Sequence, residues 1–320
     1  MSKMKVSVLV PVYGVERYIE QCATSLMEQT YKDVEYIFVD DCTPDASIDQ
    51  LKQVIEQYPE RRHQVKILNH AQNLGVAMVR KTALNAATGD AVVFVDSDDY
   101  VESTMIEKLV DKMLTTRADF IDGGYSIVNN GASVKQCYPM HVSDKAYLKT
   151  YLCQNVESNR IWGRLIKRSL FVDNNITFLK GVDYGEDFSV LPRLLINARR
   201  SWVDECLYYY RDDNSQSYTN NITTKNAISF LKAQQIVGEY LLNHPRWKTF
   251  AVSAQMGWVN VWRFARSFNV ERSLVEEHFK LKPTCLTTQF LTALMKSRLP
   301  FKLVNFIYMS SRRIYLLMVK

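Results

Sequence analysis

The sequence has no uninterrupted apolar run of the roughly 18 residues that a helix needs to cross a bilayer. We also expect no secretory signal peptide, because the apolar run at 6–12 is short and leads directly into Tyr13-Gly14. The 40 Lys and Arg residues and 34 Asp and Glu residues give a formal net charge of +6 without a long basic block. This charge pattern does not indicate a nucleic-acid partner.

Paired cysteine spacing of the kind that binds metals is also missing. The six cysteines are typical of reduced thiols in a cytoplasmic protein of this size, and Cys22 is expected to be a small core residue. The five histidines are scattered, and the sequence assigns a role to none of them.

Apolar strands and amphipathic helices alternate along the first 122 residues. The pattern predicts strands at 6–12, 34–39, 65–68 and 91–95, and helices at 16–29, 48–58, 76–87 and around 106–113. We expect Gly89 to close the third helix. Strands separated by helices of this length require right-handed crossovers and a parallel sheet, so this half predicts an α/β fold.

The pattern changes after residue 122. Alternating residues around Asn129-Asn130-Gly131 predict a hairpin within 123–139, and helical segments follow at 227–242 and 251–268. We predict one domain over 1–224, made of halves 1–122 and 123–224, and a helical region over 225–320.

The run AVVFVDSDDYV at 91–101 is the most informative feature. A buried parallel strand is expected to end in Asp96, Asp98 and Asp99, at the sheet edge where α/β proteins bind ligands. Three clustered carboxylates repel one another unless a cation joins them, and oxygen ligands of this kind favour Mg²⁺ or Mn²⁺ with a nucleotide phosphate. The alternative is an acidic turn whose side chains accept backbone hydrogen bonds.

Two more strand ends carry polar residues. We expect Tyr13 to lie on a nucleobase and Asp40 to accept hydrogen bonds from a base or ribose, while Asp45 and Ser47 cap the following helix. The sequence has neither a P-loop nor a Gly-rich dinucleotide fingerprint after the first strand. Phosphate must then be handled by a metal and by cations, of which Arg80 and Lys81 are the nearest.

The ordered segments VSVLVPVYGVERYIEQCATSL, IFVDDCTPDAS and NLGVAMVRKTALNAATGDAVVFVDSDDYV resemble family 2 glycosyltransferases with the GT-A fold. The resemblance implies a mixed sheet flanked by helices and a nucleotide-sugar site. It places the nucleotide on Pro11, Val12, Tyr13, Glu16, Asp40, Asn73, Gly75, Arg80, Asp96 and Ser97, and the metal, Mn²⁺ or Mg²⁺, on Asp98. Gly14, Cys42, Met78 and Lys81 depart from the Asn, Gly, Ala and Asn that family members commonly carry, which puts local backbone geometry in question.

The resemblance also implies an acceptor half. Asp187 matches the family's catalytic base, and Glu186 is expected to orient the acceptor. The alternative is that both carboxylates only stabilise the start of a helix over 188–197.

Trp162 forms either a wall for a sugar or part of the core, and Arg211 is expected to reach the diphosphate when the loop 212–221 closes. For Tyr208, Tyr209 and Tyr210 we predict a strand with alternating faces.

These features predict an inverting, metal-dependent glycosyltransferase for cell-surface polysaccharide synthesis, with UDP-sugar the favoured donor and a glycan or lipid-linked oligosaccharide the acceptor. The alternatives are a non-catalytic nucleotide-binding scaffold subunit and a nucleotidyltransferase; the latter would need a Gly-rich basic loop after the first strand. Segment 299–320 is apolar and basic, which suits a helix either at a membrane interface or on the protein's own core. We expect a cytoplasmic protein, peripheral at the inner face of the membrane if that segment binds lipid.

Overall fold

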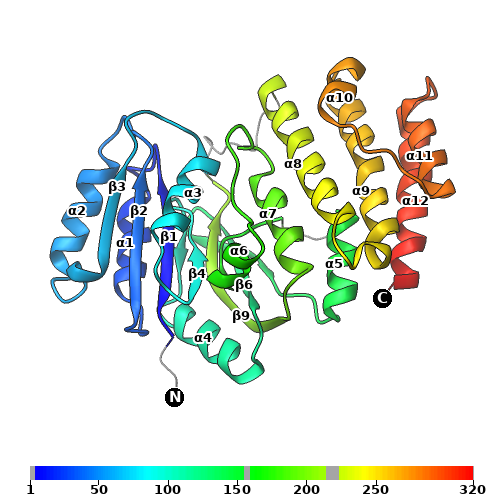
Figure 1. The fold of residues 1–320 in the computed structure, drawn as a ribbon. Helices are drawn as coiled ribbons and strands as arrows, with labels where there is room; N and C mark the ends of the chain where they lie inside the picture. The colour runs from blue at the N-terminus through cyan, green and yellow to red at the C-terminus, as the bar shows by residue number, and fades with distance from the viewer. Residues whose placement is uncertain (1–3, 155–158, 214–222, 320) are drawn as a thin grey trace. The chain divides into compact units, whose positions relative to one another are not determined.

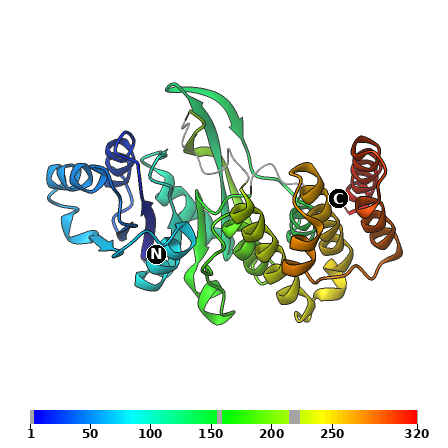
Figure 2. The ribbon, with the colours of Figure 1, turned by 90° about the horizontal axis from the view of Figure 1, so that it is seen from above.

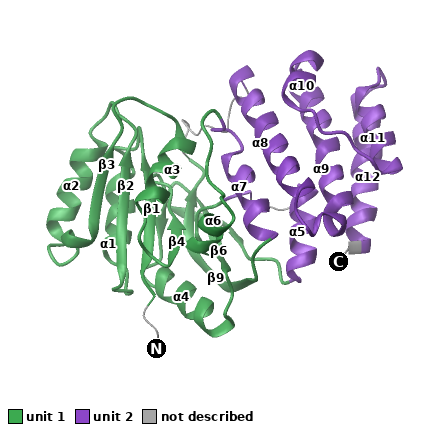
Figure 3. Cartoon of the chain, viewed as in Figure 1, with its two compact units in different colours: residues 1–141, 161–181, 197–217 green, residues 142–160, 182–196, 218–320 purple. Residues whose placement is uncertain are grey.

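The chain forms two compact units (Figure 3). The computed structural model describes residues 4–154, 159–213 and 223–319. Unit 1 comprises 1–141, 161–181 and 197–217, and unit 2 comprises 142–160, 182–196 and 218–320. The units are discontinuous in sequence because the helices of 142–160 and 182–196 cluster with those after residue 224. The domain boundary predicted near residue 224 stays a prediction.

Unit 1 is built on one mixed sheet with strand order β3-β2-β1-β4-β8-β6-β9-β5 (Figure 1). The first four are parallel neighbours, as predicted: β3 (Val65–Asn69), β2 (Val34–Asp40), β1 (Val6–Val12) and β4 (Ala91–Phe94). Val12 pairs with Asp40, so β1 and β2 end together at one edge of the sheet. β1, β2 and β4 are almost entirely buried, which explains their near-continuous apolar sequences.

The other half of the sheet is largely antiparallel. β8 (Arg164–Lys167) runs antiparallel to β4 and β6 (Phe120–Asn129), whereas β9 (Arg200–Arg211) is parallel to β6 and antiparallel to the short β5 (Tyr100–Val101). β7 (Ala132–Cys137) forms the predicted hairpin with β6. Its turn residues Asn130 and Gly131 both have positive φ, as a two-residue hairpin turn requires.

Four helices that pack on this sheet lie at nearly the predicted positions: α1 (Ile19–Met27), α2 (Ser47–Gln57), α3 (Val76–Ala86) and α4 (Met105–Thr116). The short 3₁₀ helix η1 (Arg62–Gln64) and α6 (Arg168–Asp173) were not predicted. The helix expected from Glu16 begins three residues later, at Ile19, and its buried face includes Cys22 in the core, as predicted.

Gly89 does not close α3, contrary to the prediction. The helix ends at Ala86, Ala87 is extended, and Gly89 is not among the glycines with positive φ. Position 89 instead requires a residue without a side chain, because a Cβ there would lie 2.7 Å from Ser7 Oγ. Its backbone N–H donates to that same hydroxyl at 2.9 Å.

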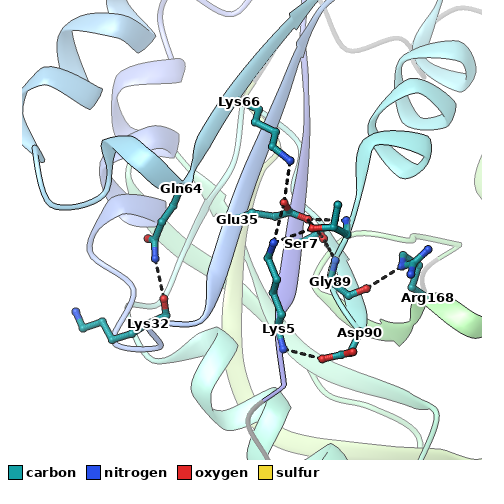
Figure 4. Close-up of polar contacts among 10 residues, drawn as sticks. Lys5, Ser7, Lys32, Glu35, Gln64, Lys66, Gly89, Asp90 and Arg168 are labelled. Atoms are coloured by element: carbon teal, nitrogen blue, oxygen red, sulfur yellow. Dashed lines mark hydrogen bonds and ion pairs between the residues drawn. The ribbon is translucent and has the colours of Figure 1, made fainter.

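The hydroxyl of Ser7 belongs to a polar network around buried Glu35 on β2 (Figure 4). The Glu35 carboxylate accepts hydrogen bonds from Ser7 Oγ at 2.6 Å and from the backbone N–H of Thr88 at 2.6 Å. Lys5 Nζ and Lys66 Nζ lie 3.2 and 3.1 Å from it. Burial raises the pKa of Glu35, but the hydrogen bonds from Ser7, Thr88 and Lys66 outweigh burial and lower it from 4.5 to about 2.

Unit 2 is helical in the part that the structure describes. It contains α5 (Asp144–Leu152), α7 (Glu186–Leu195), α8 (Thr224–Leu242), α9 (Trp247–Ser267), α10 (Arg272–His278), α11 (Leu286–Lys296) and α12 (Phe301–Val319). Its core gathers around Trp258, Val259 and Tyr308. Among the described helices of both units, none is long and apolar enough to cross a membrane.

We predict that Glu35→Gln destabilises the protein by roughly 2 kcal/mol at pH 7, because the charge-assisted hydrogen bonds become neutral ones. The folded pKa lies below the unfolded one, so this stabilisation is present above about pH 5 and is lost as pH falls toward 2. Urea unfolding at pH 7 and pH 3 measures the difference. Glu56→Gln, on an exposed position of α2, is the matched control and should change stability little. If the difference in free energy of unfolding between the Glu35→Gln variant and the parent protein grew as pH fell, the ionised carboxylate would not be the source of this stabilisation.

Candidate functional site

The loops after β1 and β2 leave the same sheet edge and are joined by side-chain hydrogen bonds. Asp45 is central: its carboxylate accepts from the backbone N–H of Glu16 at 3.0 Å and of Ser47 at 3.2 Å. Three further bonds join the loops: Gly14 N–H to Thr43 Oγ1 at 2.8 Å, Val15 N–H to Ser47 Oγ at 3.1 Å and Ala46 N–H to Glu16 Oε2 at 3.2 Å. The N-cap position of α2 is Ala46, without a side-chain cap bond, and Ser47 is the first helical residue, so the predicted capping by Asp45 and Ser47 is wrong. The two side chains instead join the loops, and Glu16 holds the neighbouring loop.

Tyr13 and Asp40 lie at this edge with side chains that are not fully buried. The Tyr13 side chain is 50% exposed, and Asp40 is half-buried with one oxygen accepting from the Thr43 N–H at 2.8 Å. Val12, in contrast, has a fully buried side chain, and its carbonyl accepts from the Asp41 N–H at 3.0 Å. Pro11 before it is half-buried. Of the four, Tyr13 and Asp40 have the side chains suited to contact a ligand.

Asp41 is a residue that the sequence reasoning missed. Its buried carboxylate accepts from the backbone N–H groups of Leu74 and Gly75, each at 2.9 Å. His70 Nδ1 lies 2.7 Å from the same carboxylate, and His70 Nε2 lies 2.9 Å from Thr82 Oγ1. Asp41 therefore fixes the segment that carries Asn73 and Gly75, which both were predicted to lie near the diphosphate.

The sequence does contain a feature that points to this role of Asp41. Asp41 follows Asp40 directly, and His70 follows the last residue of β3, so both are strand-end residues. Gly75 has φ +88°, a conformation that favours glycine, and this explains why the turn into α3 carries one.

The turn after β4 gives its three carboxylates different surroundings. Asp96 Oδ1 lies 2.9 Å from Arg80 Nη2, so the arginine predicted to meet phosphate is buried and paired with Asp96. Asp98 is half-buried, and Ser97 between them is buried. Asp99 is buried and bonded to the protein itself. The expectation that one cation joins all three is therefore wrong for Asp99.

Asp99 binds two groups of β9. It accepts from the Tyr208 hydroxyl at 2.7 Å and from the Arg211 backbone N–H at 2.8 Å. The Tyr208 oxygen also accepts from the Asp96 N–H at 3.0 Å, so one hydroxyl bridges both ends of the acidic turn. Burial, with the neighbouring charges of Asp98 and Asp96, raises the pKa of Asp99 well above its ordinary value.

Trp162 lies in an aromatic cluster next to this turn. Its ring stacks on Tyr208 with centroids 4.3 Å apart and on Tyr210 at 5.4 Å, and meets Tyr125 edge-on at 5.2 Å. The side chain is buried, which matches the core alternative, and its role as a sugar wall stays a prediction. Tyr209 points to the opposite face and stacks on Tyr100, so the alternating strand is confirmed.

Arg211 ends β9 beside α1. Its guanidinium lies over the rings of Tyr18 and Tyr100, at 5.4 and 5.2 Å, and donates to the Gln21 side chain. Most of the loop 212–221 that was expected to bring Arg211 to the diphosphate lies outside the described residues. The phosphate role of Arg211 stays a prediction.

The predicted base belongs to unit 2. Glu186 and Asp187 form the first turn of α7, and Asp187 is buried. Gly185, at φ +88°, occupies the N-cap position, so neither carboxylate is the cap residue itself. The helix dipole favours ionised carboxylates at this end. Convergence of Asp187 with Asp98 of unit 1 stays a prediction.

The side chains of unit 1 fit a divalent ion that is shared with a ligand. Asp96 and Asp98 are both half-buried, Asp96 pairs with Arg80, and Asp99 is buried and bonded to β9. No group of three or more His, Cys, Asp or Glu side chains within the described ranges is placed to hold a metal. Mg²⁺ in particular is commonly held by one or two carboxylates together with substrate phosphates, which this donor set matches.

Comparison with known proteins decides the family. The model of glycosyl transferase family 2 matches residues 7–171, the region that contains β1 to β4 and the acidic turn. The chain belongs to glycosyl transferase family 2. Its mixed sheet confirms the predicted GT-A fold: *Staphylococcus aureus* TarS 1–349 in complex with UDP-GlcNAc superposes with a TM-score of 0.65 and 24% identity, over 91% of this chain and 80% of that one.

Curated relatives match over part of their length. The uncharacterized glycosyltransferase EpsJ of *Bacillus subtilis* is 31% identical over 218 residues, which are 65% of this chain and 61% of EpsJ. The poly(ribitol-phosphate) beta-N-acetylglucosaminyltransferase TarS of *S. aureus* is 30% identical over 218 residues, 65% of this chain and 35% of TarS. The chain thus spans less than two thirds of either relative.

The departures from the family pattern have different structural consequences. Met78 and Lys81 lie within the regular α3, where their identity does not alter the backbone. Cys42, at a position where family 2 members commonly carry Gly, has φ +60° and an exposed side chain. A non-glycine residue in this region costs about 1 kcal/mol. Cys42 therefore occupies a strained position in the turn immediately after Asp40 and Asp41.

We predict that Tyr208→Phe lowers the free energy of unfolding by roughly 1–3 kcal/mol, because the Asp96 N–H and the Asp99 carboxyl lose a buried partner. Tyr210→Phe is the matched control, since Tyr210 also stacks on Trp162. Urea denaturation of both variants measures the difference. Equal stability of the two variants would show that the bridging hydroxyl does not support the turn.

Cys42→Gly is expected to stabilise the protein by about 0.5 kcal/mol, since relief of the positive φ exceeds the added entropy of the unfolded chain. Cys42→Val should destabilise it, because a β-branched side chain is strongly disfavoured there. Thermal unfolding under reducing conditions compares the two. If the Cys42→Val variant were more stable than the Cys42→Gly variant, the turn at Cys42 would not be strained.

Proposed function

We propose that this chain is an inverting glycosyltransferase that moves a sugar from a nucleotide-sugar donor to a hydroxyl of a glycan or lipid-linked acceptor. The proposal rests on one observation: Asp40 ends β2, and Asp96 and Asp98 follow β4, the two strands that pair with either side of β1 within the region that matches family 2. Carboxyl ends of parallel strands are the usual ligand edge of such sheets.

The donor is expected to lie along that edge. The exposed ring of Tyr13 offers a face for the base, and Asp40 offers an acceptor for base or ribose hydrogen bonds. Asp96 is oriented by Arg80, which leaves its other oxygen for ribose, and Asn73 and Gly75 lie on the segment fixed by Asp41. Asp98 would hold Mn²⁺ or Mg²⁺, which when bound offsets the charge that develops on the leaving diphosphate.

Asp187 is the proposed base. Its carboxylate takes the proton of the acceptor hydroxyl while that oxygen bonds to the anomeric carbon and the bond to the nucleoside diphosphate breaks. Attack from the face opposite the leaving group inverts the anomeric centre. Asp187 lies in the first turn of α7, where the positive end of the helix dipole favours a negative side chain. Glu186 beside it, and Trp162 in unit 1, are proposed to contact the acceptor.

The names of similar proteins favour a donor and a setting. TarS is named for transfer of N-acetylglucosamine to poly(ribitol-phosphate), and its structure was solved in complex with UDP-GlcNAc. By analogy we propose a UDP-sugar donor and a role in cell-surface polysaccharide synthesis at the cytoplasmic side of the membrane. The non-catalytic scaffold is the competing function that an experiment must exclude.

Thermal unfolding with UDP, GDP, TDP and CMP, each with Mn²⁺ or with chelator, tests the donor site. We expect UDP with Mn²⁺ to raise the melting temperature by a few degrees, because a ligand at about 100 times its Kd adds roughly 2.7 kcal/mol. Asp98→Ala should abolish this shift. Asp187→Ala should keep the shift but lower UDP release from a UDP-sugar, assayed with lipid extract as acceptor, by about a hundredfold or more.

Asp49→Ala, on the exposed face of α2, is the control and should leave both readouts unchanged. Unchanged turnover in Asp187→Ala would remove it as the base. A metal-dependent UDP shift without turnover in the intact protein would support the scaffold function. No shift with any nucleotide would refute the proposed donor site.

A further inference from the structure

The helix α12 packs on unit 2 through one apolar stripe. Val304 and Tyr308 are buried against the core, and the Tyr308 hydroxyl donates to the Met256 carbonyl at 3.3 Å. Tyr315 continues the stripe, with its hydroxyl 2.7 Å from Ser253 Oγ on α9. These contacts hold α12 as part of the folded unit.

A second apolar stripe runs along the side of α12 that faces away from the core. Leu303, Phe306, Ile314 and Leu317 follow the i, i+3, i+11, i+14 spacing of one helix face, and they are 49%, 69%, 61% and 70% exposed. We call these four residues the outer stripe. Large apolar side chains this exposed, in a row of four, are unusual on a surface that meets only water.

The neighbouring helix α11 also carries exposed apolar side chains. Leu286 and Phe290 on α11 are 82% and 60% exposed. In both views of the ribbon, α11 and α12 form the outer layer of the helical unit beyond α9 (Figures 1 and 2). A cleft of about 320 Å³ lies among α9, α11 and α12, and Val252, Ile314 and Met318 are among its lining residues.

Charge distinguishes this part of the chain from the rest. Residues 279–320 contain eight Lys and Arg residues and no Asp or Glu, whereas the preceding 278 residues contain 32 basic and 34 acidic ones. The net charge of the protein therefore comes from the segment that carries α11 and α12. Lys302 and Arg313 are exposed and lie on one flank of the outer stripe by helical spacing, and Arg298 lies just before α12.

We propose that the outer stripe and its basic flank form a docking surface for an anionic lipid bilayer. Exposed Leu, Phe and Ile side chains enter the headgroup region, and Lys302 and Arg313 meet lipid phosphates, the arrangement of a helix that lies in a membrane interface. The docking rests on this surface alone. Its use, presenting the site to a lipid-linked acceptor, rests on the proposed function.

Flotation of the full chain with two kinds of vesicle tests the docking: phosphatidylcholine alone, and equal parts phosphatidylcholine and phosphatidylglycerol. We expect binding to the anionic vesicles at least tenfold stronger, and weaker binding as salt increases. Phe306→Glu/Leu317→Glu should abolish binding. Val172→Glu/Leu242→Glu, which changes exposed apolar residues on α6 and α8, is the matched control and should retain it.

The charge contribution has its own pair of variants. Lys302→Gln/Arg313→Gln should weaken binding to anionic vesicles roughly tenfold or more, whereas Lys32→Gln/Lys180→Gln, at exposed positions of unit 1, should not. If both pairs of variants lost vesicle binding equally, binding would depend on net charge alone, and the proposal of a specific docking surface would be wrong.

Two further outcomes would overturn the proposal. One is equal binding, or no binding, to both kinds of vesicle. The other is a lipid-independent dimer, seen by sedimentation, that Phe306→Glu/Leu317→Glu dissociates while vesicle binding is absent; the surface would then join two copies of this chain. The UDP-dependent thermal shift should be unchanged in every variant, so failure of the docking and failure of the donor site are separate results.

Discussion

The acidic turn depends on one buried hydroxyl. Tyr208 on β9 accepts a hydrogen bond from the Asp96 N–H and donates one to Asp99, and so joins both ends of the turn after β4 to a strand more than 100 residues later. Its ring also stacks on Trp162. Because the oxygen is wholly inside the protein, both bonds must form or a buried group loses its partner. The position of Asp98, between these two fixed points, follows from that constraint.

The two strand ends use adjacent aspartates in the same way. In Asp40-Asp41 and in Asp98-Asp99 the first carboxylate is half-buried, and the second is buried and bonded to the protein. In each pair one carboxylate is partly exposed at the end of the strand, while the other turns inward. The inward carboxylate accepts backbone N–H groups of another segment and holds it in place. Each pair therefore contains one partly exposed carboxylate, which is proposed to meet the ligand, and one anchor for the surrounding loops.

The local sequence pattern was sufficient to predict the parallel half of the sheet. β1, β2 and β4 are buried, and their continuous apolar runs are typical of buried parallel strands. The Asn130-Gly131 turn was equally plain. The pattern could not tell which aspartate of a pair is the anchor, because that depends on partners such as Tyr208 and His70 far along the chain. Gly89 was misread for the same reason: its small size serves a contact with Ser7 on another strand, not the end of its own helix.

The segment after residue 299 shows a limit of amphipathic patterns themselves. A single apolar face suits a helix on the core and a helix on a membrane alike, so the sequence pattern alone could not decide between them. α12 has two faces: Val304 and Tyr308 pack inward, and Phe306 and Leu317 point out. The inward face matches the interpretation of a helix on the core, and the outer face is the one proposed to meet a membrane. Since the inward contacts are complete without the outer ones, the outer stripe is available to a partner without any unfolding of α12. Binding through it would then cost no ordering of the helix, which favours association with even a modest apolar area.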